Sequence, residues 1–280
     1  MKVISLINMK GGVAKTTLSV NIADFIARRL KKNVLLIDVD PQFNATQCLI
    51  SGEDYYEYML QRKDTIINIF ERNAYPVTGI VTGSATVTPK SMSKIEPYSV
   101  KANFDLIPGA LDLYMLEMSA GDGREFCIKN YLDFVKDKYD YVIIDTPPTP
   151  SVWMSSALLA SDYYLIPTKA DPISITGIDM LFSIIEQKKS RYGIRNIQCC
   201  GVVLTLAEIA TIVYKNAVSN LSKSDRWKKL LYRSYLPKKT IVAREQLQQR
   251  FILDSENDVL KASLTGIVRE LLAKVGDENE

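Results

Sequence analysis

The stretch VISLINMKGGVAKTT, residues 3–17, decides the fold class of this chain. Residues 3–7 form a short apolar run typical of a buried β-strand, and apolar residues at helical spacing follow from Thr16 to Leu30. Between them lies a loop with two adjacent glycines, followed by Lys15 and Thr16. A strand, a glycine loop, a Lys-Thr pair and a helix in this order predict a phosphate-binding loop.

This loop has the residue types that phosphate binding requires. Glycine lets successive backbone N–H groups curl around phosphate oxygens, and the helix N-terminus adds the positive end of its dipole. We expect Lys15 to reach the β- and γ-phosphates of a nucleotide and the Thr16 hydroxyl to bind Mg²⁺. The general pattern G-x-x-x-x-G-K-[ST] is not met, because Met9 and Ala14 occupy both glycine positions. A tight turn with an incidental lysine is the alternative interpretation.

Two later strands each end in aspartate. Asp38 and Asp40 follow the predicted strand 34–37, and Asp145 follows the predicted strand 141–144. In an open parallel sheet these C-terminal strand ends lie on the side of the phosphate-binding loop, and Mg²⁺ prefers such oxygens, often through water. The sequence therefore predicts a Mg²⁺ site beside the loop. The alternative is that each aspartate only caps a helix or forms a turn.

Strands and helices alternate along the rest of the chain. The further predicted helices and strands are residues 104–107, 124–138, 152–160, 163–166, 173–187 and 200–204. This alternation predicts an α/β fold, a doubly wound, mostly parallel sheet with helices on both faces. Neither a linker nor an internal repeat interrupts it, so we expect a single P-loop domain over residues 1–280. The polar stretch 82–102 is expected to form a long surface loop or a small hairpin.

Composition excludes several classes of protein. Apolar residues make up 47% of the chain and charged residues 24%, as in soluble globular domains. No apolar run approaches the ~18 residues of a membrane span, and the N-terminus lacks the features of a signal peptide. Four cysteines without a C-x-x-C pair, and the lack of histidine, exclude a disulfide framework, a Cys/His zinc site and histidine catalysis. We therefore expect a cytoplasmic protein.

The charge of the chain is unevenly distributed. Residues 188–250 contain 14 Lys and Arg against 3 Asp and Glu, whereas the whole chain has a net charge of only +3. Such asymmetry predicts a basic surface in the C-terminal part of the domain that binds a polyanion. The alternative is a set of ordinary solvated helix faces.

Together these motifs resemble the ParA/Soj branch of the deviant Walker A ATPases, the plasmid and chromosome partition proteins. That family carries KGGVGKTT, DxDPQxN and YDYxxxDxPP, which stand here at residues 10–17, 38–44 and 139–148. Weaker similarities continue at residues 105–108, 158–167, 177–180, 201–205 and 236–238. The similarity covers nearly the whole chain. Because the chain starts at the first strand, the extra N-terminal DNA-binding domain of some plasmid members is expected to be absent.

The resemblance implies roles for individual residues. Lys10 resembles the signature lysine that crosses a nucleotide-sandwich dimer to the partner's phosphates, and Asp40 the residue that positions the attacking water. Asp38 and Asp145 would hold Mg²⁺ and its water shell together with Thr16. The implied nucleotide contacts are Lys10, Gly11, Gly12, Val13, Ala14, Lys15, Thr16, Thr17 and Pro237. Ala14 replaces a glycine that we expect to have positive φ, where alanine is strained.

The resemblance further implies a function in DNA partition. An ATP-bound homodimer with Mg²⁺ would bind nucleoid DNA non-specifically and hydrolyse ATP slowly until a ParB-type or small centromere-binding adaptor stimulates it. The DNA-binding candidates in the basic region are Lys215, Lys223, Arg226, Lys228, Arg233, Lys238, Lys239 and Arg244, with Lys229 and Arg250 as further candidates. The nearby aromatic residues Trp227, Tyr232 and Tyr235 are expected to pack rather than to stack on bases.

Two other functions fit the same fold. A MinD-like membrane ATPase needs a C-terminal basic amphipathic helix, but the apolar stripe from Leu260 to Val275 is followed by the acidic tail 277–280. We expect that stripe to pack in the core, and no membrane partner. A nucleotide-dependent DNA-binding regulator that does not hydrolyse ATP is the other alternative, because of Ala14. A cluster carrier is disfavoured, because Cys199 and Cys200 lie in a predicted buried strand.

Overall fold

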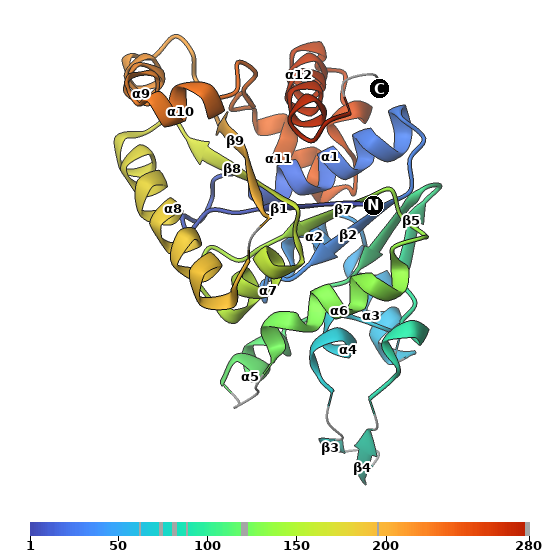
Figure 1. Cartoon of the computed structure of the whole chain (residues 1–280). Helices are drawn as coiled ribbons and strands as arrows, with labels where there is room; N and C mark the ends of the chain where they lie inside the picture. The colour runs from blue at the N-terminus through green and yellow to red at the C-terminus, as the bar shows by residue number, and fades with distance from the viewer. Residues whose placement is uncertain are drawn as a thin grey trace.

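A seven-stranded sheet forms the centre of the computed structural model, which describes residues 1–61, 63–72, 75–79, 83–87, 89–118, 123–194 and 196–277 (Figure 1). The strand order is β5-β6-β2-β7-β1-β8-β9. The strands are β1 Lys2–Leu6, β2 Val34–Asp38, β5 Tyr98–Lys101, β6 Phe104–Ile107, β7 Tyr141–Asp145, β8 Tyr163–Lys169 and β9 Gln198–Thr205. Six of them are parallel, and β5 pairs antiparallel with β6 at one edge.

Helices cover both faces of this sheet (Figure 1). They are α1 Lys15–Arg29, α2 Asn44–Gln47, α3 Gly52–Leu60, α4 Ile66–Phe70, α5 Leu113–Met118, α6 Cys127–Val135, α7 Val152–Ala160, α8 Pro172–Tyr192, α9 Ile212–Lys223, α10 Asp225–Leu230, α11 Thr240–Leu247 and α12 Asp258–Lys274, with the 3-10 turns η1 Met92–Lys94, η2 Arg124–Phe126 and η3 Ile252–Asp254. Side chains along each strand point alternately to the two faces. Leu36 and Ile143 belong to the core cluster of α1 and α12, whereas Leu35 and Val142 belong to that of α6 and α7.

The predicted doubly wound α/β fold is confirmed, and most of its elements agree with the sequence. Strand 104–107 and helix 152–160 have the predicted bounds. The predicted helix 124–138 is wrong in detail, because a 3-10 turn occupies residues 124–126 and α6 ends at Val135. The antiparallel edge strand β5 was not predicted, because its sequence YSVK is short and half polar.

Residues 82–102 contain several elements. The first strand of this stretch, β4 Gly83–Val87, pairs antiparallel with the preceding strand β3 Tyr75–Gly79 as a separate two-stranded sheet, at the lower edge of Figure 1. The turn η1 and strand β5 follow, so the end of this stretch joins the central sheet. Residues 82 and 88 lie outside the described part of the chain.

The sheet brings the aspartates of the two strand-end motifs to one edge. In the register of β2 against β7, Asp38 lies directly beside Asp145, and Leu6 at the end of β1 also pairs with Asp145. The phosphate-binding loop leaves β1 at this same edge. The parallel sheet therefore places two carboxylates next to the loop that was predicted to bind phosphates.

Gly109 allows the turn after β6 to pack against one of these carboxylates. Its N–H donates to Thr46 Oγ1 over 2.8 Å, and Thr46 Oγ1 in turn donates to Asp38 Oδ2 over 2.8 Å. A Cβ at position 109 would lie 2.7 Å from Phe43 Cβ and 3.0 Å from Asp38 Cγ. Any residue larger than glycine would therefore push the turn away from Asp38.

We predict that Gly109→Ala lowers the free energy of unfolding by about 1–3 kcal/mol, because the added methyl group overlaps Phe43 and Asp38. Urea unfolding measures the change. Gly52→Ala is the matched control, since no atom lies within 4 Å of its Cβ position, and it should be neutral. An unchanged urea midpoint for Gly109→Ala would contradict the close packing of this turn against Phe43 and Asp38.

Candidate nucleotide-binding site

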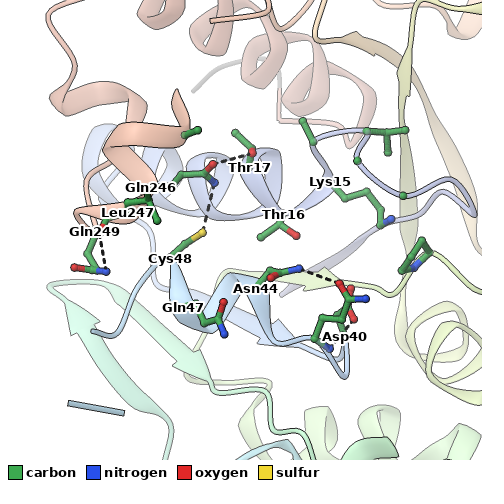
Figure 2. Close-up of a pocket in the computed structure, with 17 residues that line it drawn as sticks. Lys15, Thr16, Thr17, Asp40, Asn44, Gln47, Cys48, Gln246, Leu247 and Gln249 are labelled. Carbon is green, nitrogen blue, oxygen red and sulfur yellow. Dashed lines mark hydrogen bonds between the residues drawn. The ribbon is translucent and has the colours of Figure 1, made fainter. Parts of the chain in front are cut away.

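A cavity of about 510 Å³ opens at the C-terminal edge of the sheet, between the loop after β1, helix α2 and helix α11 (Figure 2). Its lining includes residues 11–17 of the loop and Asp40, and it continues past Cys48 to Gln246. Segments from the start, the middle and the end of the chain thus meet around one hollow.

The loop has the backbone shape that binds phosphate. Gly12 and Ala14 have φ of 64° and 58°, so two positive-φ residues flank Val13. Such alternation turns successive N–H groups toward one point. Thr205, at the end of β9, donates its hydroxyl to the Val13 carbonyl over 2.8 Å and anchors the loop to the sheet. The expected positive φ at position 14 is confirmed.

Lys15 is a buried cation below the loop. Its Nζ donates to the Asn8 carbonyl over 3.0 Å, and the residue is only 7% exposed. Burial lowers its pKa, while the nearby carboxylates of Asp145 and Asp40 act in the opposite direction. A phosphate group bound in the cavity would add negative charge beside Lys15 and so stabilise its ammonium form.

Asp38 and Asp145 lie beneath the cavity rather than in its wall, and both are fully buried. Asp145 accepts hydrogen bonds from the hydroxyls of Thr16, over 2.7 Å, and Ser19, over 2.8 Å. Asp38 accepts from the backbone N–H and the hydroxyl of Thr46, each over 2.8 Å. Burial raises the pKa of both carboxyls, and in Asp38 the neighbouring Asp145 raises the pKa further.

The oxygen atoms of Thr16 and Asp145 suit Mg²⁺, provided that other ligands complete its coordination shell. Thr16 lines the cavity and its hydroxyl contacts Asp145, so a hydroxyl and a carboxylate lie together beside the phosphate-binding loop. Among the described residues, no group of three or more His, Cys, Asp or Glu side chains is placed to hold a metal ion. Mg²⁺ here would therefore complete its shell with phosphate oxygens and water.

Asp40 borders the cavity on the side opposite the loop (Figure 2). It is nearly buried, and its Oδ1 accepts the Gln42 N–H over 2.9 Å. Burial raises its pKa, opposed by the Gln42 N–H and by the charge of Lys15. The carboxylate thus lies where it can act on a group bound next to Lys15.

Two predicted nucleotide contacts lie outside the cavity wall. Lys10 Nζ forms an ion pair with Asp171, with distances of 3.0 and 3.2 Å to the two carboxylate oxygens. Pro237 is buried and forms a parallel bridge with Ala207. Residues 11–17 and Asp40 are the predicted residues that the structure brings together around the hollow.

The sequence did not point to the far side of the cavity. Helix α11 and the turn after it contribute Ala243, Gln246, Leu247 and Gln249, and α2 contributes Gln47 with Cys48 next to it. No motif marks these residues. The run QLQQ, residues 246–249, is the one local signal of an exposed segment. Glutamine side chains usually lie at the surface, so the leucine between them is expected to be exposed as well.

The DNA-binding candidates are all exposed, but several already have partners. Lys238 pairs with Glu208 over 3.1 Å, and Arg226 lies 4.2 Å from the ring centre of Phe182. They lie on or next to α9, α10 and α11. The exposed candidates are Lys215, Lys223, Arg226, Lys228, Lys229, Arg233, Lys238, Lys239, Arg244 and Arg250. Trp227 and Tyr232 are buried, which confirms packing for these two aromatic residues.

We predict that Ala14→Gly raises the free energy of unfolding by about 1 kcal/mol, because alanine pays a steric penalty at a φ of 58° that glycine does not. Chemical denaturation measures the change. Ala262→Gly, at an exposed position within α12, is the control and should lower stability by roughly 0.5–1 kcal/mol. If both variants lose stability alike, position 14 has no left-handed strain to relieve.

Comparisons with known proteins agree with this geometry. A family model described as AAA domain matches residues 1–198. The sporulation initiation inhibitor protein Soj of Bacillus subtilis is 29% identical over 239 residues, 85% of this chain and 84% of its own.

Two solved structures share the fold. A plasmid partition protein from Borrelia burgdorferi superposes with a TM-score of 0.71 at 23% identity, over 98% of each chain. The ATP complex of a Cyanothece McdA variant superposes with a TM-score of 0.77 at 19% identity, over 98% of this chain and 96% of McdA. With the loop geometry and the three motifs, these findings lead to one conclusion: the chain belongs to the AAA domain family and is a ParA/Soj-type P-loop ATPase.

Proposed function

We propose that this protein is a DNA partition ATPase whose ATP-bound homodimer binds DNA non-specifically and hydrolyses ATP when an adaptor protein stimulates it. The observation that carries the proposal is the cavity itself, in which a left-handed phosphate loop, Lys15 and Asp40 surround one hollow above two buried carboxylates. The chromosome partitioning protein ParA of Caulobacter vibrioides, which is 29% identical over 210 residues, and the Borrelia plasmid partition protein support a role in partition, and the McdA complex supports ATP as the ligand.

Each group around the cavity has a separate role in the proposed hydrolysis. The N–H groups of the loop and Lys15 bind the phosphates and spread their negative charge. Thr16, Asp38 and Asp145 would hold Mg²⁺, which would neutralise further phosphate charge. Asp40 accepts a hydrogen bond from a water molecule and orients it toward the terminal phosphate. One orienting carboxylate without a stronger base explains why hydrolysis would be slow without a partner protein.

Lys10 connects hydrolysis to dimer formation in this proposal. In the single chain its Nζ contacts Asp171 rather than the cavity. To reach the phosphates bound by a second copy, Lys10 would exchange this half-exposed ion pair for a phosphate contact. Exposed ion pairs contribute little, so a multiply charged phosphate can replace the carboxylate.

The basic surface gives the proposed dimer its DNA contacts. Exposed lysines and arginines on α9, α10 and α11 can neutralise backbone phosphates without reading the base sequence. Binding to any DNA would keep the protein on the nucleoid. A ParB-type or small centromere-binding adaptor would then release it by stimulating hydrolysis.

The two alternative functions are less well supported. The apolar stripe of α12 is buried, with Leu264, Val268 and Leu271 fully enclosed against the core that includes α1, so it cannot also insert into a membrane. Within the described residues, no helix has both the length and the apolar character to span a bilayer. A regulator that only binds nucleotide is disfavoured because Ala14 keeps the glycine-like turn and Asp40 borders the cavity.

We predict that Lys15→Ala weakens ATP binding at least about thirtyfold, because it removes a buried cation that faces the phosphates.

Asp40→Ala should bind ATP normally but hydrolyse it about 10²- to 10⁴-fold more slowly, since an orienting carboxylate acts mainly in the transition state. Calorimetry and phosphate release measure the two effects. If Asp40→Ala hydrolyses ATP at the parental rate, the role of Asp40 is wrong.

We predict that the double variant Lys238→Glu/Lys239→Glu loses DNA binding while it keeps ATP binding. Parental affinity should fall steeply with salt and vary little with DNA sequence, because the contacts are to phosphates. The control is Lys136→Glu/Lys138→Glu, which makes the same charge change at two exposed lysines after α6. Fluorescence anisotropy with duplex DNA, with and without ATP, measures binding. Equal losses in both double variants would refute a local DNA surface.

A further inference from the structure

Three aliphatic side chains are exposed together in the loop after β9 and the first turn of α9, a helix at the upper left of Figure 1. Ile209 is 49% exposed, Ile212 69% and Val213 43%. We call these three residues the apolar tip. None of them belongs to the wall of the nucleotide cavity. Single exposed aliphatic residues are common on protein surfaces, whereas a group of them indicates a contact surface.

The turn that carries the apolar tip is closed by hydrogen bonds. The N–H and the hydroxyl of Thr211 both donate to the Glu208 carbonyl, over 3.0 and 2.7 Å. As the N-cap of α9, the same hydroxyl oxygen accepts the Tyr214 N–H over 3.2 Å. This turn brings Ile209 next to the first turn of the helix. Because the turn is already ordered, the apolar tip loses little conformational entropy when it binds a partner.

The start of the same loop is fixed to the segment before α11. The Ala207 N–H donates to the Leu236 carbonyl over 3.0 Å, and the Ala207 carbonyl accepts the Lys238 N–H over 3.1 Å. Just before it, Leu206 has a φ of 49°, a left-handed conformation that is unfavourable for a leucine. Strained residues of this kind cluster in segments with a function. The fold therefore holds the loop firmly in a shape that exposes aliphatic side chains.

Basic residues border the apolar tip. Lys215 is exposed on α9, and its N–H donates to the Thr211 carbonyl over 3.2 Å, so it lies one helical turn from the cap. On the other side, the exposed Lys238 forms an ion pair with Glu208 over 3.1 Å. Glu208 is one of only 3 acidic residues among residues 188–250, which contain 14 basic ones. The surface thus has an apolar centre and a basic border.

An acidic protein segment complements this surface better than DNA or a second copy does. Aliphatic side chains form no favourable contact with the phosphates of DNA, and the Glu208 carboxylate would repel them. In a two-fold contact between the apolar tips of two copies, the basic borders would face each other and repel. A segment with aliphatic residues between carboxylates complements both the apolar centre and the basic border.

We propose that the apolar tip is a docking site for an amphipathic protein segment with aliphatic residues at its centre and Asp or Glu around them. Ile209, Ile212 and Val213 cover the aliphatic residues of the segment, and Lys215 and Lys238 pair with its carboxylates. The proposal does not depend on the proposed function, because no residue of the apolar tip contributes to nucleotide binding.

Selection from a random library of displayed peptides, on the full chain, tests the docking site. Peptides are selected on the parental protein after depletion on Ile209→Ser/Ile212→Ser, which removes the two most exposed side chains of the apolar tip. The enriched peptides should combine aliphatic residues with a net negative charge. In calorimetry, a synthetic peptide of enriched sequence should bind this double variant at least about tenfold more weakly than the parental protein, and Lys215→Glu at least about threefold more weakly.

Phe134→Ser/Val259→Ser is the matched control. It also removes two exposed apolar side chains, but from α6 and α12. This control should bind the peptide with the parental affinity. Because all four replaced side chains are exposed, urea unfolding should show that both double variants keep the parental fold.

Several results would overturn the proposal. The first is a selection that enriches no peptide, or only peptides without net negative charge. If Ile209→Ser/Ile212→Ser weakens duplex DNA binding as much as Lys238→Glu/Lys239→Glu does, the apolar tip belongs to the DNA surface. If it abolishes ATP-dependent dimer formation in size-exclusion chromatography, the apolar tip contacts a second copy. If phosphatidylglycerol vesicles co-sediment the parental protein but not this double variant, the apolar tip binds a lipid surface instead.

Discussion

The burial of two carboxylates side by side is the constraint on which the rest of the site depends. Asp38 and Asp145 end neighbouring parallel strands, and both are fully enclosed. Two like charges in a dry interior are strongly unfavourable unless hydrogen bonds and a cation compensate for them. Hydroxyls of Thr16, Ser19 and Thr46 donate to the pair, and the buried ammonium of Lys15 contributes opposite charge. Repulsion between the two carboxylates remains, and a bound Mg²⁺ would reduce it.

This constraint explains why small residues lie around the pair. The turn after β6 must approach Asp38 closely enough for the Gly109 N–H to reach Thr46, and only glycine leaves room for that approach. Thr46 then holds the carboxylate through its hydroxyl and its backbone N–H. The polar groups around Asp38 are satisfied by neighbours from the loop after β2 and the turn after β6. Packing and electrostatics at this edge therefore cannot be changed independently.

The parts of the structure that could be predicted from sequence are those fixed by local pattern. The loop 10–17, the buried strands and the positive φ of Ala14 follow from glycine spacing, apolar runs and backbone sterics. Features that depend on distant contacts were missed. Strand β5 exists because β6 offers it an edge, and the cavity wall at Gln246 exists because α11 folds back onto α1. Neither contact can be predicted from the periodicity of the sequence.

The nucleotide cavity is lined by segments from both ends of the chain. The family model ends at residue 198, whereas the cavity wall continues to Gln249. Asn21 on α1 links the two parts, because it donates to the Thr17 carbonyl over 2.8 Å and accepts the Ile252 N–H over 2.7 Å. The phosphate end is thus built from residues within the family match, and the opposite end from residues beyond it. Because Asn21 lies on the same helix as Lys15 and Thr16, the position of the segment after α11 depends on the helix that carries the phosphate-binding residues.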